Sequence, residues 1–184
     1  ISSNYLNRGI PIKVIKCLKK GPAAARNMGV KISTGEWILF NDSDCIPTRD
    51  LITGYINSEN GSIGYAGNIK SYNSDLISKY YESQEILIPL KSRNNNNDYS
   101  PQYLITANCL VLKEAIEKIK GFNESITIAA GEDIDMGIKL TEIGRLSYSF
   151  DSIAYHDFND GWRGFRKRFI RYGEGNKIIE DIWK

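Results

Sequence analysis

The chain has 184 residues, of which 41% are hydrophobic and 25% charged, and its formal net charge is +2. This length suits one domain with a substantial core, and the small net charge argues against nucleic-acid binding. No apolar run reaches the roughly 20 residues that cross a bilayer. Cys17, Cys45 and Cys109 are widely spaced, which argues against a disulfide framework or a zinc site and fits a reducing compartment. A single histidine, His156, excludes a His-rich metal cluster.

The pattern of apolar and turn residues predicts strands that alternate with helices. In the first half of the chain we expect a strand at 11–15, a helix from 23 to about 34, a strand at 36–40, a helix at 47–56, a strand at 63–69 and a helix at 75–90. After a loop at 91–101 we expect one long strand or a strand pair at 104–112, helices at 113–119 and 132–143, a strand at 146–150 and a helix at 162–172. Such alternation predicts an α/β sandwich with a largely parallel sheet.

Two carboxylates one residue apart, Asp42 and Asp44, follow the strand at 36–40. Ligands of open α/β sheets bind beyond the carboxyl ends of strands, where this segment is expected. The pair can share one hard cation, or divide a cation and a sugar hydroxyl between them, and Mg²⁺ or Mn²⁺ prefers such oxygen ligands. The same spacing occurs in ordinary turns, so a purely structural role is the alternative.

A second acidic group, Glu132, Asp133 and Asp135, falls where the helix at 132–143 is expected to begin. Carboxylates are favoured at a helix N-terminus, so the group could be a capping cluster. The alternative is that one of them is a general base directed at an acceptor hydroxyl. His156 follows a strand-like segment and is either a polar surface residue or a ligand that completes a metal shell.

Several segments together resemble the family-two glycosyltransferases of the GT-A fold. They are Gly-Pro-Ala-Ala-Ala-Arg-Asn-Met-Gly at 21–29, Gly-Glu-Trp-Ile at 35–38 and Asp-Ser-Asp-Cys-Ile-Pro at 42–47, followed in the expected order by Glu132-Asp133, His156 and an arginine-rich segment at 166–175. The resemblance covers about 12–175. It implies a GT-A, Rossmann-like, three-layer α/β/α sandwich with a mostly parallel central sheet, of the bacterial inverting type.

The resemblance assigns three side chains to the metal and the donor. Asp44 would be the direct ligand of Mn²⁺ or Mg²⁺, which would clamp the diphosphate of a nucleotide-sugar donor. His156 would be a further ligand, and Asp42 would contact the ribose, the metal or its water shell. A divalent ion of this kind neutralises the phosphates of the departing nucleoside diphosphate.

The resemblance also implies roles in the transfer itself. Asp133 would be the catalytic base that takes the acceptor proton, and Glu132 would orient it or contact the acceptor. In-line attack inverts the anomeric centre and needs no covalent enzyme nucleophile. Arg26 would face the nucleotide or brace the aspartate loop. The alternative, which we weigh equally, is that Arg26 only forms a salt bridge within the fold.

The helix at 162–172 combines an apolar stripe with a basic rim. The stripe is formed by Trp162, Phe165, Phe169 and Tyr172, which favours docking on the core. The surrounding cations are Arg163, Arg166, Lys167, Arg168 and Arg171. They either remain solvated or meet acceptor phosphate or an anionic membrane surface. We therefore expect a saccharide or lipid-linked acceptor, and a cytoplasmic protein that contacts the inner face of the plasma membrane through this helix.

The chain begins Ile1-Ser2-Ser3, without the apolar strand and acidic second strand with which relatives usually open. We expect residues 1–184 to be a single GT-A domain that lacks its N-terminal base-binding strand or strands. The predicted function is inverting, metal-dependent sugar transfer in bacterial cell-surface polysaccharide or glycoconjugate synthesis. The alternatives are a nucleotidyltransferase, which also pairs aspartates with metal and nucleotide, and an inactive carbohydrate-binding domain derived from a transferase.

Overall fold

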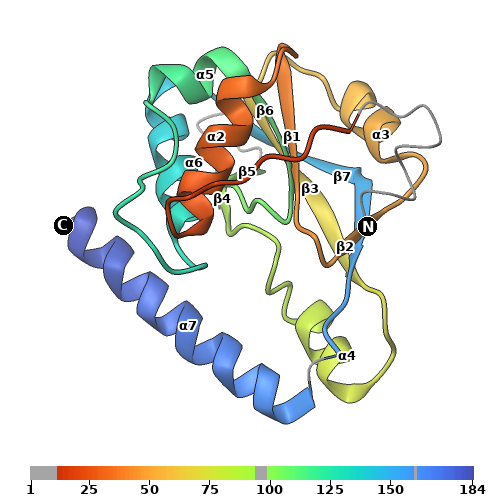
Figure 1. The fold of residues 1–184 in the computed structure, drawn as a ribbon. Helices are drawn as coiled ribbons and strands as arrows, with labels where there is room; N and C mark the ends of the chain where they lie inside the picture. The colour runs from red at the N-terminus through yellow and green to blue at the C-terminus, as the bar shows by residue number, and fades with distance from the viewer. Residues whose placement is uncertain (1–11, 94–98, 160) are drawn as a thin grey trace.

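A computed structural model describes residues 12–93, 99–159 and 161–184 (Figure 1). In chain order its elements are α2 (Pro22–Ile32), β1 (Trp37–Asn41), β2 (Cys45–Pro47), α3 (Leu51–Asn57), β3 (Gly64–Ser71), α4 (Leu76–Ser83), β4 (Lys91–Arg93), β5 (Tyr99–Pro101), β6 (Asn108–Leu112), α5 (Lys113–Lys118), α6 (Glu132–Ile143), β7 (Leu146–His156) and α7 (Gly161–Ile182). The start of the chain, Pro11 of the first expected strand and the centre of the expected loop at 91–101 lie outside the described residues.

The central sheet has five strands in the order β1-β6-β3-β7-β2. β3 and β7 pair in parallel, whereas the β1–β6, β3–β6 and β2–β7 pairs are antiparallel. Strands β1, β3 and β7 therefore run in one direction, and β6 and β2 run against them. The expectation of a mostly parallel sheet is wrong for these strands. A parallel neighbour needs a crossover connection, whereas the chain enters β6 at the same end of the sheet at which it left β3.

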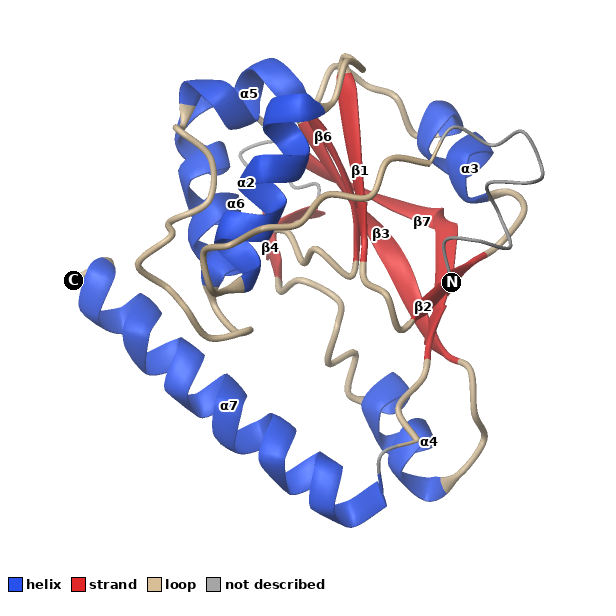
Figure 2. Ribbon diagram, in the orientation of Figure 1, coloured by secondary structure: helices blue, strands red, loops and turns tan. Residues whose placement is uncertain are grey.

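Helices cover both faces of this sheet, as Figure 2 shows, so the expected three-layer α/β/α arrangement is present. Helices α2, α5 and α6 gather on one side and α3 on the other (Figure 1). Each face has its own apolar cluster. The first includes Val30, Phe40, Val111, Ile116, Met136 and Leu140, and the second includes Leu51, Tyr55, Tyr65, Ile77, Tyr81 and Phe158.

The last helix, α7, is twice as long as expected and joins two distant parts of the fold. Near its start, Phe165 and Phe169 pack against Tyr81 of α4, with ring centroids 5.6 and 6.0 Å apart. Near its end, a Cβ on Gly175 would lie only 2.6 Å from the Cβ of Ala130, so the helix lies directly against the segment before α6. The contacts at both ends hold α7 as a bridge between α4 and α6.

Several element boundaries differ from the sequence prediction. The described part of the expected first strand, 12–15, is not in a strand, and Val14 is 73% exposed. Helix α4 stops at Ser83, and β6 covers only the second half of 104–112. The expected loop at 91–101 carries the β4–β5 hairpin, while β7 extends the predicted strand to His156. None of the helices in the described ranges is both long and apolar enough to cross a membrane.

Candidate active site

The aspartate loop leaves the sheet at the end of β1. The backbone N–H of Asp42 donates to the carbonyl of Ala107 at 3.4 Å, and the N–H of Cys45 donates back to the carbonyl of Asp42 at 3.0 Å. The Asn41 side chain donates to the Cys45 carbonyl at 3.2 Å. These bonds close a tight turn that directs the Asp42 and Asp44 side chains outward, and both are partly exposed to solvent.

Helix α2 carries Arg26 to this loop. Ala23 and Ala24 are buried on one side of the helix, while the Asn27 side chain is bonded to the backbone N–H and carbonyl of Phe122 at 2.8 and 2.9 Å. With the helix fixed in this way, Arg26 donates to Asp42 Oδ1 at 3.1 Å and to Glu132 Oε1. Arg26 thus joins the loop after β1 to the start of α6, a contact that fits both the bracing of the aspartate loop and the salt-bridge alternative.

Glu132 and Asp133 have different surroundings although they are adjacent. Glu132 is buried, and its second oxygen has no hydrogen-bond partner among the described residues. Asp133 accepts bonds from the backbone N–H groups of Thr106, at 3.3 Å, and Ile134, at 2.9 Å. Burial, followed by the neighbouring Glu132 carboxylate, raises the pKa of Asp133 to about 6, while Arg26 opposes this shift. A carboxylate with such a pKa is ionised at neutral pH and can accept a proton readily.

Asp135, the third member of the acidic group, has a purely structural environment. It is fully buried, bonded to Lys139 at 2.6 Å and to the indole N–H of Trp183 at 3.1 Å. The three carboxylates are therefore not a common capping cluster, because the N-cap residue of α6 is Gly131 and no described side chain caps the helix. Glu132 pairs with Arg26, Asp133 reaches the cavity described below, and Asp135 fixes the end of α7.

His156 comes next to Asp44 through the pairing of β2 with β7. In this antiparallel pair Cys45 lies opposite His156, and the Asp157 N–H donates to the Asp44 carbonyl at 3.1 Å. His156 Nε2 lies 3.4 Å from Asp44 Oδ2. Burial lowers the pKa of His156 although Asp44 opposes this, so the imidazole is neutral near pH 7 with a lone pair available.

The donor atoms at this place fit a divalent cation. One ligand atom each from Asp44, Cys45 and His156 lies within 4.8 Å of the other two. A carboxylate and an imidazole are suitable ligands for Mn²⁺, and the exposure of Asp44 leaves room for phosphate oxygens and water. Burial, together with the Asp42 and Asp44 carboxylates, raises the pKa of the Cys45 thiol to about 12, so this side chain is a neutral thiol in the metal-free protein.

An aromatic stack supports the histidine. The His156 ring stacks on Phe158 at 4.2 Å between centroids, and Phe158 stacks on Tyr81 at 4.3 Å. The Arg168 guanidinium lies over the Tyr81 and Phe158 rings at 5.3 and 5.5 Å. This packing orients the imidazole and places one cation of α7 close to His156.

All six side chains predicted from the sequence line one cavity of about 720 Å³: Arg26, Asp42, Asp44, Glu132, Asp133 and His156. The loop after β1 and the end of β7 supply one wall, and the start of α6 supplies another. Helix α7 closes a further side with Arg168, Arg171, Tyr172 and Asn176. The cavity therefore combines carboxylates, an imidazole and arginine cations in one place.

Sequence reasoning did not identify every group in this cavity. Thr106, whose backbone N–H bonds Asp133, was expected inside a strand and carries no motif signal. Arg168 and Arg171 were noted only as part of a basic rim, and the apolar stripe beside them was the one signal that this face of the helix is turned inward.

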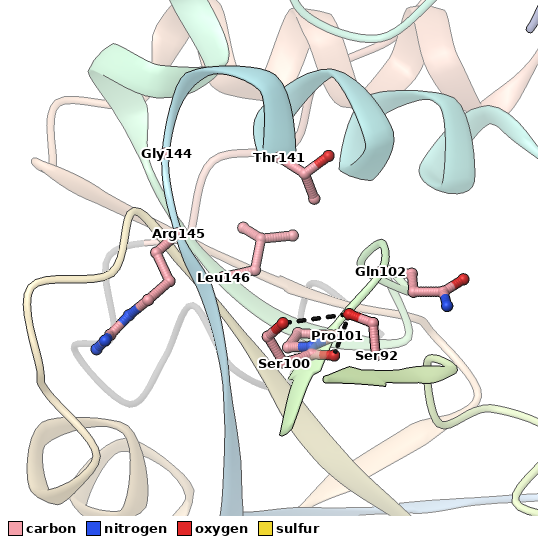
Figure 3. Close-up of a pocket in the computed structure, with 8 residues that line it drawn as sticks. All are labelled: Ser92, Ser100, Pro101, Gln102, Thr141, Gly144, Arg145 and Leu146. Atoms are coloured by element: carbon pink, nitrogen blue, oxygen red, sulfur yellow. Dashed lines mark hydrogen bonds between the residues drawn. The ribbon is translucent and has the colours of Figure 1, made fainter. Parts of the chain in front are cut away.

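A second cavity, of about 370 Å³, lies between the β4–β5 hairpin and the turn from α6 into β7, and Figure 3 shows its lining. The Ser92 hydroxyl donates to the Ser100 carbonyl at 3.2 Å. Arg145 extends away from the other side chains and donates to Ser62 and to the Asn60 carbonyl at 3.0 and 2.9 Å. Arg145 is the only cation among the described residues that line this cavity, and it already has these partners. Because no predicted site residue lines the cavity either, it is not a candidate active site.

Comparison with known proteins gives the same family as the sequence motifs. The sequence model described as "Glycosyl transferase family 2" matches residues 1–120. This range contains Arg26, Asp42 and Asp44 and ends before α6. "Pre-mycofactocin glycosyltransferase" of two Mycobacterium tuberculosis strains, CDC 1551 / Oshkosh and ATCC 25618 / H37Rv, is 28% identical over 160 residues, which cover 84% of this chain and 34% of the relative. The chain thus spans about a third of the length of these curated relatives.

Solved structures of glycosyltransferases share the fold at low identity. The mannosyltransferase PcManGT from Pyrobaculum calidifontis, in complex with GDP-Man and Mn²⁺, has a TM-score of 0.64 and 16% identity over 90% of this chain and 45% of its own. S. aureus TarS 1-349 in complex with UDP-GlcNAc has a TM-score of 0.60 and 18% identity over 89% of this chain and 46% of its own. The expected GT-A class of α/β fold is confirmed. With a family match over more than half of its residues, the chain belongs to glycosyl transferase family 2.

Proposed function

We propose that this chain carries the catalytic site of an inverting glycosyltransferase that moves a sugar from a nucleotide-diphosphate-sugar donor to an acceptor hydroxyl. The observation that carries the proposal is the convergence of Asp44, His156 and Asp133 on one cavity of about 720 Å³, although up to 112 positions separate them in the chain. Family membership and the donors named for PcManGT and TarS support the same reaction.

In this proposal Asp44 and His156 hold Mn²⁺ or Mg²⁺ at the end of β7, and Asp42 contacts the ribose or the water shell of the metal. The ion, when bound, offsets the charge of the departing diphosphate. Arg168 and Arg171, which line the same cavity, add positive charge on the side of the leaving group. Arg26 acts mainly as the brace between Asp42 and Glu132 rather than as a ligand of the nucleotide.

Asp133 is the proposed catalytic base. Its carboxylate is held by the Thr106 and Ile134 N–H groups and takes the proton of the acceptor hydroxyl as that oxygen attacks the anomeric carbon. Glu132, fixed by Arg26, keeps the start of α6 in place and contributes negative charge that raises the pKa of Asp133. Direct displacement with inversion is the simplest mechanism for this assignment, because it requires Asp133 as a base and no covalent enzyme nucleophile.

The acceptor is proposed to be a saccharide or a lipid-linked saccharide of bacterial cell-surface synthesis, approached from a cytoplasmic membrane face. Trp162 and Ile170 on α7 are 71% and 52% exposed, and Leu76 on α4 is 80% exposed. Arg163, Arg166 and Lys167 make no ion pair with a carboxylate of the described part of the chain. Apolar side chains surrounded by unpaired cations favour contact with an anionic membrane.

Calorimetry with UDP and GDP, with and without Mn²⁺, tests the donor site. We expect metal-dependent binding of at least one nucleotide in the wild-type protein, and its loss in Asp44→Ala, with thermal unfolding unchanged within a few degrees. Metal-independent binding, or unchanged binding in Asp44→Ala, would contradict the assignment. Release of a nucleoside diphosphate from the donor identifies glycosyl transfer, release of pyrophosphate identifies a nucleotidyltransferase, and sugar binding without either product identifies an inactive carbohydrate-binding domain.

A further inference from the structure

Cys45 adds a sulfur atom to the proposed metal site. Cys45 on β2 and His156 on β7 are opposite residues of an antiparallel pair, so their side chains share one face of the sheet. Asp44 directly precedes Cys45, and one ligand atom from each of the three residues lies within 4.8 Å of the others. The wide spacing of the three cysteines argued against a zinc site, but the fold brings Cys45 together with Asp44 and His156 as a set of mixed ligands.

The burial of these side chains gives the site a closed inner side and an open outer side. Cys45 and His156 are 7% and 4% exposed, whereas the Asp44 side chain is 53% exposed and lines the large cavity. His156 Nε2 faces Asp44, and its other ring nitrogen, Nδ1, is buried without a hydrogen-bond partner in the described ranges. An imidazole nine-tenths buried and directed at a carboxylate is a second observation, independent of the cysteine, that points to a bound cation.

Cations differ in how they use such a set of ligands. Mg²⁺ and Mn²⁺ prefer oxygen and make little use of sulfur. Zn²⁺ binds cysteine sulfur at about 2.3 Å and histidine nitrogen or carboxylate oxygen at about 2.0–2.2 Å. A tetrahedral ion with these bond lengths holds its ligand atoms about 3.3–3.8 Å apart, so closing the present separations requires movements of about 1 Å.

We propose that Cys45 makes this site a high-affinity site for a thiophilic divalent cation such as Zn²⁺, bound through Asp44, Cys45 and His156. The proposal rests on the proposed function only in assigning Asp44 and His156 to a metal. As the zinc–sulfur bond forms, the S–H bond of Cys45 breaks and its proton passes to solvent. Zn²⁺ then competes with Mn²⁺ for Asp44 and His156, and the fourth position stays open for water or a phosphate oxygen.

Titration of the nucleotide-free protein with Co²⁺ tests the proposal, because cobalt bound to a thiolate gives a charge-transfer absorption in the near ultraviolet. We expect this band in the wild-type protein and in Cys17→Ser, a matched control whose thiol lies outside the three-ligand group and donates to the Lys19 carbonyl. The band should disappear when Zn²⁺ is added. Cys45→Ser should lack the band. Mutating a residue that hydrogen-bonds a metal ligand lowers metal affinity by about 10- to 100-fold. Cys45→Ser removes a direct ligand, so the affinity for Zn²⁺ should fall by at least as much. Mn²⁺ affinity should change little.

Absence of the band from the wild-type protein, or its persistence in Cys45→Ser, overturns the assignment of Cys45. If Cys45→Ser does not fold, X-ray absorption of the zinc-loaded wild-type protein decides, since one sulfur neighbour at about 2.3 Å is expected and none would refute the proposal. Mn²⁺-dependent nucleotide binding is measured in parallel. If that binding is intact while sulfur ligation is absent, only the role of Cys45 is wrong, whereas loss of both also removes the proposed metal-dependent donor site.

Discussion

Replacing Arg26 with Met tests whether this arginine braces the site. Met keeps much of the length and apolar volume of the side chain but removes the charge that joins Asp42 to Glu132. The Glu132 side chain is only 4% exposed, so without Arg26 its carboxylate is buried with no compensating cation among its described contacts. The substitution therefore destabilises mainly through Glu132, because the exposed carboxylate of Asp42 can be solvated.

The structure sets the expected size of this effect. Removing one partner of a buried ion pair costs about 3–5 kcal/mol. Arg26 keeps 19% of its side chain exposed, which admits some water, so the lower end, about 3 kcal/mol, applies. In a domain of this size 1 kcal/mol corresponds to about 2–4 °C, which predicts a fall in Tm of about 6–12 °C. The pKa of Asp133 should also rise further, because the positive charge of Arg26 lowers it in the wild-type protein.

Thermal and urea unfolding of four proteins measures the prediction: wild type, Arg26→Met, Glu132→Gln and the double variant. The double variant should recover part of the stability lost in Arg26→Met, because no unpaired buried charge remains. Lys19→Met provides the control, since it breaks an exposed ion pair with Glu124 and should cost less than about 1 kcal/mol. A loss below about 1 kcal/mol in Arg26→Met, or no recovery in the double variant, would refute the bracing role.

Three further predictions concern the catalytic base, the pH dependence of the reaction and the membrane contact. Asp133→Asn should leave Mn²⁺-dependent nucleotide binding within about twofold but lower the transfer rate by about 100-fold or more. The variant should be at least as stable as the wild type at pH 7, because a carboxyl whose pKa in the folded protein is raised to about 6 makes the wild-type protein less stable as the pH rises towards that value. Normal turnover by the variant would exclude Asp133 as the base. The wild-type kcat/KM should rise with pH through about 6, and a flat profile there would count against the same assignment. Arg166→Glu/Lys167→Glu should bind phosphatidylglycerol vesicles at least about 30-fold less tightly in sedimentation assays, because each lost basic residue costs about 1 kcal/mol and the added carboxylates are repelled. Lys31→Glu/Lys118→Glu on α2 and α5 should bind as the wild type does. Equal binding by the two double variants would remove α7 from the membrane contact.

Local sequence was sufficient to predict those elements whose structure depends on residues close together in the chain. The apolar run before Asp42 predicts β1, because its apolar side chains are partly or fully buried on the sheet and the polar turn ends it. Gly131 and the acidic residues after it predict the start of α6, because that signal lies within one helical turn. The ordered motifs also predicted the family and the six side chains that line the cavity, although their individual roles stay predictions.

Only the tertiary structure decided how these pieces meet. The position of β6 between β1 and β3 depends on pairing between segments far apart in the chain, which local propensity does not encode. The neighbourhood of Cys45 and His156 arises from the register of β2 with β7 across 111 positions. Similarly, α7 closes the cavity because Gly175 permits close contact with Ala130 and Phe165 packs on Tyr81. Sequence patterns indicate which face of a helix or strand is apolar. The shapes of the side chains and the register of the strands determine which other element that face packs against.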